Sequence, residues 1–236
     1  MANSYFQFKQ FTIHQGQCAM KVSTEACILG AWIPVSTPNR ILDIGTGTGL
    51  LSLMLAQRIN APIDAIELDE AAAQQAKKNA LESKWKESVK VINQSVFEWT
   101  QSIDHTYDLI VSNPPFFTDS LKSETNSKNL AKHDTSEFNK QNLAAVLKIL
   151  LSENGRAYIL YPELESQQFK AEVEKIGLFY SEALVIRNQP KGPVFRVISK
   201  ITKTEQKCES ESLNIREGQV HSESFEKLLS GYYLKY

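Results

Sequence analysis

The sequence predicts an α/β protein whose sheet is mostly parallel and is covered by helices on both faces. Short apolar strands alternate with helical segments from Arg40 to Ile176, which is the pattern of a parallel sheet. A glycine-rich turn directly follows the first of these strands. Beyond Gly177 two strand-like segments follow each other without a helix, so we expect an antiparallel pair there.

Apolar periodicity and capping residues place the individual elements. The first 20 residues mix aromatic with basic side chains, and a helix follows that Ser23 or Thr24 can cap, with Glu25 in its first turn. Strands are expected at residues 40–45, 63–68, 89–92, 107–112 and 156–161. Helices are expected at residues 23–32, 50–59, 69–82, 143–151 and 165–176. The antiparallel pair comprises residues 182–187 and 193–201, and residues 225–236 close the chain.

The composition indicates one soluble, intracellular domain. The chain has 236 residues and a formal net charge of −1, so no global excess of basic residues indicates nucleic-acid binding. The three cysteines, Cys18, Cys27 and Cys208, have no metal-ligand spacing and fit a reduced protein. The N-terminal residues lack the apolar core of a signal peptide, and no apolar run approaches the length of a membrane span. We expect a cytoplasmic protein that contacts any nucleic acid through a local patch.

The first strand ends in the pattern D-x-G-x-G-x-G, formed by Asp43, Gly45, Gly47 and Gly49. Glycines let the backbone turn tightly and approach a ligand, and the following helix presents free amides. A dinucleotide fingerprint would need a glycine at position 50, which is Leu50. The spacing instead suits S-adenosylmethionine, which carries an amino-acid tail and no phosphate.

Glu67 ends the second strand, where an acid can accept hydrogen bonds from both hydroxyls of a ribose. Asp64 lies inside that strand, and Asp69 starts the next helix. Taken alone, the glycines could be only a strand-to-helix turn and Glu67 a solvated acid. The first acid, the glycines and the second acid stand in register on consecutive strands, which favours a cofactor site.

Asn113-Pro114-Pro115-Phe116 follows the fourth strand, and ligands of open parallel sheets bind beyond the carboxyl ends of the strands. The amine of adenine is a poor nucleophile because its lone pair is delocalised into the ring. We expect the Asn113 side-chain oxygen and the Pro114 carbonyl oxygen each to accept a hydrogen bond from one of the two N–H groups of this amine. These hydrogen bonds favour a pyramidal nitrogen. Pro115 restricts Pro114 and so fixes that carbonyl before the reaction. Phe116 offers a flat face for the extruded base.

A plain proline turn with Phe116 and Phe117 in the core is the structural alternative for this tetrapeptide. The motif is short, and alone it does not distinguish the two interpretations. Its position after the glycine turn, in the correct strand order, favours the functional interpretation.

These motifs, together with residues 8–32 and 225–236, resemble the bacterial tRNA adenine-N6 methyltransferases that modify adenine-37, just 3′ of the anticodon, of a valine tRNA. The resemblance implies a class I, Rossmann-like methyltransferase fold with a seven-stranded sheet. It also implies a single domain of residues 1–236, in which residues 1–36 form a flap over cofactor and substrate and residues 37–236 form the core. The implied partner is the anticodon stem-loop of tRNA, and no oligomer is required.

The resemblance also assigns roles to residues. Asn113, Pro114, Pro115 and Phe116 would be catalytic. "MKVSTEA", residues 20–26, is similar to the family's N-terminal cofactor flap, with Ser23 near the methionine tail. The residues expected around S-adenosylmethionine are Lys21, Thr24, Asp43, Gly45, Gly47, Gly49, Glu67, Leu68, Ser95, Val96 and Asn113.

Two positions depart from the family pattern. Relatives commonly carry an aspartate at the end of the third strand, where it receives the adenine amino group of the cofactor, and here Ser95 stands in its place. A serine accepts a weaker hydrogen bond than a carboxylate, which concerns cofactor affinity and not the reaction. Residues 131–134 are similar to the family's A-R-H motif, with Lys132 in place of arginine and His133 following.

A local basic patch is the expected contact for RNA. From Arg187 to Lys207 there are six basic residues and one acid, although a solvated strand face would also explain this charge. The residues expected to contact RNA are Lys132, His133, Lys191, Arg196 and Lys200. The histidines have no metal-ligand spacing, so we expect no metal.

Three other functions remain open at this point. N-P-P-[FY] turns also serve N-methylation of a glutamine side chain in release factors and of adenine in DNA. Release-factor enzymes usually carry an additional N-terminal helical domain, and only about 40 residues precede the first strand here. No separate domain for DNA recognition is evident. A catalytically silent RNA-binding protein is the alternative from a different class: Ser95 is compatible with it, and the intact N-P-P-F turn argues against it.

Overall fold

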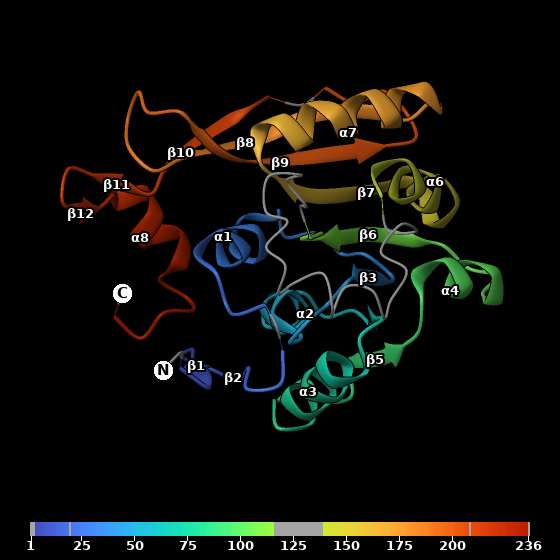
Figure 1. The fold of residues 1–236 in the computed structure, drawn as a ribbon, viewed down its shortest axis with the longest axis horizontal. Coiled ribbons are helices and arrows are strands. Elements are labelled where there is room, and N and C mark those ends of the chain that lie inside the picture. The colour runs from blue at the N-terminus through green and yellow to red at the C-terminus, as the bar shows by residue number, and fades with distance from the viewer. Residues whose placement is uncertain (1–2, 19, 116–138, 208, 236) are drawn as a thin grey trace, which may run out of the picture.

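The structure, a computed structural model, describes residues 3–18, 20–115, 139–207 and 209–235. Within these ranges the main sheet has eight strands in the order β10-β8-β9-β7-β6-β3-β4-β5. In Figure 1, β9, β7, β6 and β3 follow one another from top to bottom, and β5 lies below them. The strands are β3 (Ile41–Ile44), β4 (Ile63–Glu67), β5 (Val89–Asn93), β6 (Tyr107–Ser112), β7 (Leu151–Tyr161), β8 (Phe179–Arg187), β9 (Val194–Thr202) and β10 (Glu211–Asn214).

The strand directions confirm the expected mixed sheet. β5, β4, β3, β6 and β7 pair in parallel, whereas β9 runs antiparallel to both β7 and β8. The described sheet has one strand more than the seven that the resemblance implied, because β10 pairs in parallel with the edge strand β8. The sequence of β10, Glu-Ser-Leu-Asn, is too short and polar to reveal a strand.

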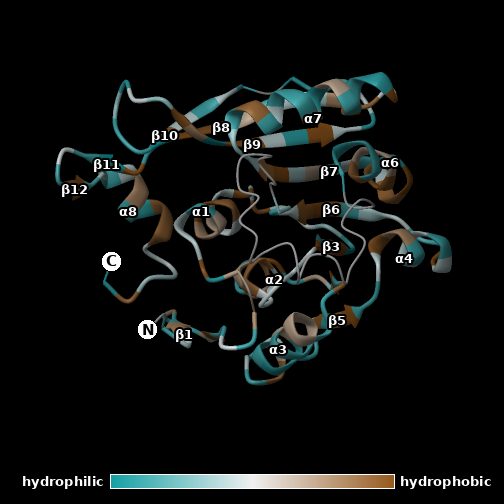
Figure 2. Ribbon diagram, viewed as in Figure 1, coloured by the Kyte–Doolittle hydropathy of each residue, from teal (hydrophilic) through white to brown (hydrophobic). Residues whose placement is uncertain are grey.

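Helices cover both faces of the sheet. α1 (Thr24–Trp32), α2 (Leu50–Ala56) and α3 (Glu70–Leu81) pack on one face, and α4 (Val96–Ser102), α6 (Lys140–Leu150) and α7 (Glu163–Lys175) pack on the other. Figure 2 shows the apolar residues concentrated on the strands and on the helix sides that meet them. The sheet therefore lies between two apolar cores, and the polar residues of interest can gather only at its edges.

The N-terminal residues form a hairpin that the sequence did not predict, with β1 (Tyr5–Gln7) antiparallel to β2 (Thr12–His14). Asn79 on α3 fixes this hairpin and is only 1% exposed. Its amide donates to the carbonyl oxygens of His14 and Thr48, both at 2.8 Å, and its oxygen accepts from the His14 amide at 3.0 Å. The hairpin is thus linked through Asn79 to the turn before α2.

The C-terminal segment packs against the same hairpin. α8 (Glu223–Leu229) and the small hairpin of β11 (Arg216–Glu217) and β12 (Val220–His221) precede it, with α8 beside α1 (Figure 1). The Lys9 amide donates to the Tyr232 carbonyl at 2.8 Å, and the Phe6 and Phe8 rings lie 5.7 and 6.0 Å from the Tyr233 ring. None of the helices in the described ranges has the length and apolar character that a membrane crossing requires.

Candidate active site

The glycine turn leaves β3 at the carboxyl edge of the sheet. Gly45, Gly47 and Gly49 all have positive φ angles, 70°, 58° and 83°, which side chains rarely adopt, so the turn requires glycine at these positions. A Cβ added to Gly45 would meet no atom of the described residues within 4 Å, so they leave the space beside the turn open there. A ligand can therefore approach the backbone of the turn closely.

Asp43 lies under this turn and is completely buried. Its Oδ2 accepts hydrogen bonds from the Thr46 hydroxyl at 2.6 Å, the Ser52 hydroxyl at 2.7 Å and the Ser52 amide at 3.1 Å. Its Oδ1 is buried and finds no hydrogen-bond partner among the described residues. Burial raises the pKa of Asp43 to about 6, although the bonds from Thr46 and Ser52 oppose the rise. The ionised Asp43 carboxylate therefore stabilises the turn through its hydrogen bonds, but its burial in the charged form is unfavourable. A cationic ligand nearby would reduce this unfavourable free energy.

Glu67 ends the neighbouring strand β4 and contacts the same turn. Its Oε2 accepts from the Gly47 amide at 2.8 Å, and its Oε1 accepts from the Asp69 amide at 2.9 Å. Burial raises the pKa of Glu67, and the bonds from Asp69 and Gly47 oppose this effect. Two carboxylate oxygens are thus held at the edge of the turn, where they can accept hydrogen bonds from a pair of ligand hydroxyls.

Asn93, which the sequence interpretation missed, holds the backbone on which Glu67 sits. Its amide donates to the carbonyl oxygens of Glu67 and Leu68 at 2.9 and 3.0 Å. The exposed Leu68 therefore has a fixed position beside the turn. A polar residue at the end of β5 was the available signal, because this is the same sheet edge.

Ser95 and Val96 lie at the start of α4, a helix that the sequence interpretation also missed. Ser95 is the N-cap, and its Oγ accepts from the Phe97 amide at 3.3 Å. Val96 is buried. The Ser95 hydroxyl therefore caps α4. It is a weaker hydrogen-bond acceptor for a ligand than a free carboxylate would be.

Strand pairing brings Asn113 next to the glycine turn. Ser112 of β6 is in register with Ile44 of β3, and the Ser112 hydroxyl donates to the Ile44 carbonyl at 2.7 Å, so Asn113 and Gly45 leave the sheet side by side. The Asn113 Oδ1 is buried and has no hydrogen-bond partner among the described residues. Pro114 is buried, and Pro115 is exposed. Phe116, Lys132 and His133 lie outside the described residues.

Cys18, in the segment expected to form the flap, lies near the glycine turn. A Cβ on Gly47 would lie 4.0 Å from the Cys18 sulfur, and burial raises the pKa of the Cys18 thiol. Lys21, expected near the cofactor, donates its ammonium group to the carbonyl oxygens of Gln15 and Cys18 and so holds the flap together. Ser23 caps α1 by accepting from the Ala26 amide, and Thr24 is the exposed first residue of that helix. The sequence interpretation did not include Cys18 among the residues near the glycine turn.

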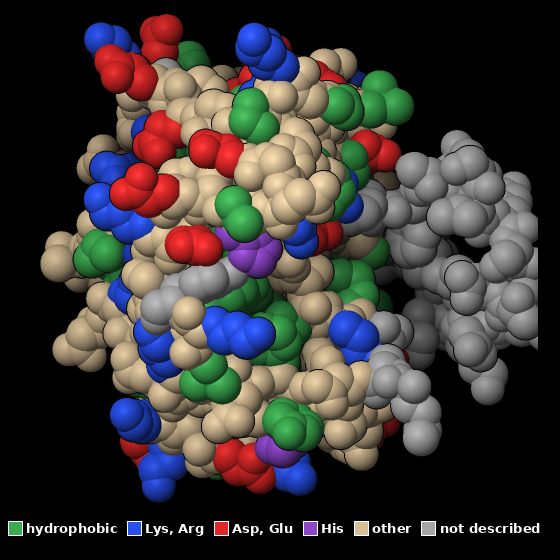
Figure 3. Space-filling view, turned by 90° about the vertical axis from the view of Figure 1, so that its left-hand side faces the viewer, with side chains coloured by type: hydrophobic (Ala, Val, Ile, Leu, Met, Phe, Trp, Pro, Cys, Tyr) green, Lys and Arg blue, Asp and Glu red, His purple; other side chains and the backbone are tan. Residues whose placement is uncertain are grey.

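Of the residues expected to bind RNA, Lys191, Arg196 and Lys200 lie in the described ranges, on β9 and in the turn before it. Lys191 is exposed in the β8–β9 turn with a positive φ of 61°, whereas Arg196 is 14% exposed and paired with Glu25. Lys200 lies four positions further along β9, about 13 Å away, opposite Tyr158 in the middle of the sheet. Figure 3 shows Lys and Arg side chains on one face interspersed with Asp and Glu. Arg196 and Lys200 therefore share one face of β9, and Arg196 pairs with a carboxylate of the protein itself.

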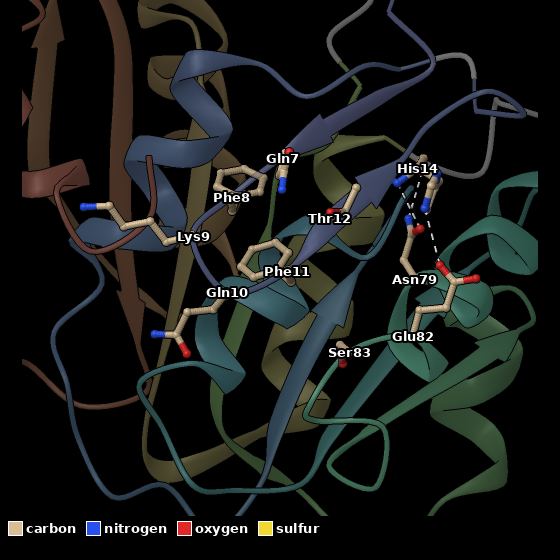
Figure 4. Close-up of a pocket in the computed structure, with 10 residues that line it drawn as sticks. All are labelled: Gln7, Phe8, Lys9, Gln10, Phe11, Thr12, His14, Asn79, Glu82 and Ser83. Carbon is tan, nitrogen blue, oxygen red and sulfur yellow. Dashed lines mark hydrogen bonds and ion pairs between the residues drawn. The ribbon is translucent and has the colours of Figure 1, made fainter. Parts of the chain in front are cut away.

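A separate cavity of about 370 Å³ lies between the N-terminal hairpin and α3. Figure 4 shows Phe8 and Phe11 on one side of it, and His14, Asn79 and Glu82 on the other. His14 pairs with Glu82 at 3.4 Å. None of the residues that line this cavity is among those expected around S-adenosylmethionine. Within the described ranges no cluster of His, Cys, Asp and Glu could hold a metal ion.

Comparisons with known proteins define the class to which this fold and this site belong. A family model described as methyltransferase small domain matches residues 18–145, which include the glycine turn, Glu67 and Asn113. A predicted O-methyltransferase from Agrobacterium tumefaciens is 15% identical, covers 87% of this chain and 95% of its own, and superposes with a TM-score of 0.66. A ribosomal protein L11 methylase from Lactobacillus delbrueckii superposes with a TM-score of 0.55 at 17% identity, over 82% of this chain and 84% of its own. The protein has the α/β methyltransferase fold.

Relatives with higher sequence identity narrow the class of methyltransferases to one family. A tRNA1(Val) (adenine(37)-N6)-methyltransferase from Trichodesmium erythraeum is 40% identical over the full length of both chains. A protein of the same name from Bacteroides fragilis is 42% identical, again over the full length of both. The chain belongs to the tRNA1(Val) (adenine(37)-N6)-methyltransferase family. This confirms the family resemblance drawn from the N-P-P-F turn and the glycine turn.

Proposed function

We propose that the protein transfers a methyl group from S-adenosylmethionine to N6 of an adenine in tRNA, adenine-37 of a valine tRNA. The observation that carries the proposal is the Asn113 Oδ1: a buried acceptor beside the glycine turn, without a hydrogen-bond partner among the described residues. A buried acceptor of this kind is costly unless a ligand satisfies it. The family relationship supports tRNA as the ligand that brings the matching N–H group.

The residues around the glycine turn fit S-adenosylmethionine. Gly45 leaves open space beside the backbone, Glu67 offers two oxygens for the ribose hydroxyls, and Asp43 supplies a negative charge with one oxygen unused by the described residues. This donor set suits a ligand with two hydroxyls and a positive charge, and it contains no group suited to a pyrophosphate beyond the turn itself. When bound, S-adenosylmethionine supplies an electrophilic methyl group on a sulfonium.

Asn113 and Pro114 would prepare the amine for transfer. The Asn113 Oδ1 accepts a hydrogen bond from one N–H group of the adenine amine, and the Pro114 carbonyl oxygen accepts one from the other. The nitrogen lone pair is therefore less conjugated with the ring and more available for transfer. Because Pro115 limits the conformations of Pro114, this geometry exists before the base arrives and costs little ordering during the reaction. Both oxygens stabilise the positive charge that develops on the nitrogen. The amine then loses a proton to water.

The proposal is tested by incubating the protein with radiolabelled S-adenosylmethionine and tRNA from a strain that lacks the modification. Nucleoside analysis should find the label in N6-methyladenosine, and the Asn113→Ala variant should give at least about 100-fold less. A release-factor domain and a DNA duplex are incubated in parallel, because glutamine and DNA adenine present similar amines. Label only in one of these substrates would refute the tRNA assignment, and no label in any would favour a silent RNA-binding protein.

A further inference from the structure

Residues 18–25, described at Cys18 and from Met20 to Glu25, cross the carboxyl edge of the sheet, and we call them the strap. At one end Cys18 lies against Gly47, in the turn after β3, and the Lys21 ammonium group holds this end by donating to the Cys18 carbonyl at 2.9 Å. At the other end a Glu25 carboxylate oxygen lies 3.4 Å from the Arg196 guanidinium on β9. One end therefore lies beside the turn after β3, and the other end is paired with β9.

Strand register shows what the strap crosses. Tyr161 at the end of β7 is opposite Val197 of β9, and Ile159 of β7 is opposite Ser112 of β6. Arg196 therefore lies at the same edge as Asn113, two strands away and two residues further along, or about 12 Å. From the turn after β3 to β9 the strap spans three strand spacings, about 14 Å, which its length allows. Between its two ends lie the carboxyl ends of β6, which Asn113 follows, and of β7.

The pair of Glu25 and Arg196 has the features of a built contact. The two side chains are only 17% and 14% exposed, which is low for charged residues. The guanidinium lies 4.1 Å from the centre of the Phe195 ring and also donates to the Phe195 carbonyl at 2.8 Å. Glu25 stands in the first turn of α1, where its charge also favours the helix. Removing Arg196 would take this cation away from the Glu25 carboxylate, which is mostly buried.

We propose that Arg196 is a positioning residue that holds the strap over the cofactor through Glu25, and not a phosphate contact for RNA. The inference rests on the proposed use of S-adenosylmethionine. Within the described residues, Arg196 acts on the strap through Glu25: its charge holds Glu25, Glu25 lies in the first turn of α1, and Ser23 and Thr24 precede Glu25 there. Loss of the pair loosens the strap at its β9 end and weakens cofactor binding, while the Asn113 corner stays intact.

Calorimetric titration with S-adenosylmethionine, without tRNA, tests this directly. Arg196→Gln and Glu25→Gln should each weaken binding about 3- to 20-fold, the range for a partly exposed charge pair. The double variant should bind no more weakly than the weaker single variant, because both remove the same interaction. Arg196→Lys should recover part of the loss. Lys170→Gln, which breaks an exposed pair with Glu174 on α7, is the matched control and should bind as the wild type does.

A second measurement separates the strap from RNA contact. The salt dependence of tRNA binding should keep its slope in Arg196→Gln and become less steep in Lys191→Gln, and saturating S-adenosylmethionine should restore most of kcat in Arg196→Gln. Unchanged cofactor affinity in Arg196→Gln with a lower salt slope would overturn the proposal and make Arg196 a phosphate contact. A wild-type protein that binds no S-adenosylmethionine would refute the proposed cofactor, and the role of the pair with it. Binding without tRNA methylation would refute only the substrate.

Discussion

Replacing Asp43 by asparagine should make the protein without cofactor more stable at neutral pH. The Asp43 carboxyl is buried, and its pKa is raised from an ordinary 3.8 to about 6. Since the folded state holds this proton more tightly than the unfolded state, protonation favours folding. The stabilisation is complete below about pH 4 and is lost as the pH rises through about 6, so the ionised carboxylate is a burden at pH 7.

The size of the effect follows from that pKa. A rise of roughly two units, at about 1.4 kcal/mol per unit, amounts to about 3 kcal/mol. An asparagine oxygen can still accept the three hydrogen bonds from Thr46 and Ser52, but its NH₂ group would replace the buried Oδ1, which costs about 1 to 2 kcal/mol. The expected net gain at pH 7.5 is about 1 to 2 kcal/mol, or a rise in Tm of about 2 to 8 °C for a chain of this length.

Urea denaturation followed by circular dichroism, from pH 4.5 to 8, measures this difference. The gap between Asp43→Asn and the wild type should open between pH 4.5 and 6.5 and then stay constant. Asp108→Asn is the control of opposite sign: although burial opposes it, hydrogen bonds from Ser152 and Asn39 hold the pKa of Asp108 below its usual value. That variant should lose stability above about pH 4. Parallel curves for Asp43→Asn and the wild type, or a less stable Asp43→Asn at pH 7.5, would refute the reasoning.

Four further outcomes are expected. Asn113→Ala should lower kcat by about 10²- to 10³-fold while calorimetry shows cofactor affinity largely kept, and an unchanged rate would remove the amide from the mechanism. Glu67→Ala should weaken S-adenosylmethionine binding by about 1.5 to 3 kcal/mol, and equal affinity would place the ribose elsewhere. Asn79→Ala should lower the free energy of unfolding by about 1 to 3 kcal/mol, because it breaks three buried bonds that hold the His14 strand and the turn before α2, and wild-type stability in urea would contradict this. Lys191→Gln should make the salt dependence of tRNA binding less steep, by about the slope of one phosphate contact. An unchanged slope in a filter-binding assay would contradict this prediction.

The sequence predicted the parts of the fold that have strong local signals. The alternation of apolar strands and helices predicted β3 to β7, and the missing helix after Gly177 predicted the antiparallel β8 and β9. The glycine turn and Asn113 could be placed together because parallel strands end at one edge. Their closeness in the structure follows from the register of Ser112 with Ile44, which no single stretch of sequence reveals.

The missed features depend on contacts between distant segments. The N-terminal hairpin is fixed by Asn79, some 65 residues away, and β10 is defined only by its partner β8. Arg196 was grouped with Lys191 and Lys200 by charge alone, and its pairing with Glu25, which is far away in the sequence, appears only in the folded chain. Local propensity carries no information on such pairings.

The N-terminal hairpin and the segment around Tyr232 are packed against each other, although more than 200 residues separate them in the sequence. The hairpin rests on Tyr232 and Tyr233, and the Tyr232 hydroxyl also donates to the Met54 carbonyl on α2 at 2.8 Å. The hairpin can therefore reach its native position only when the segment around Tyr232 has docked on α2. A substitution at Tyr232 would thus be felt at both of these distant segments.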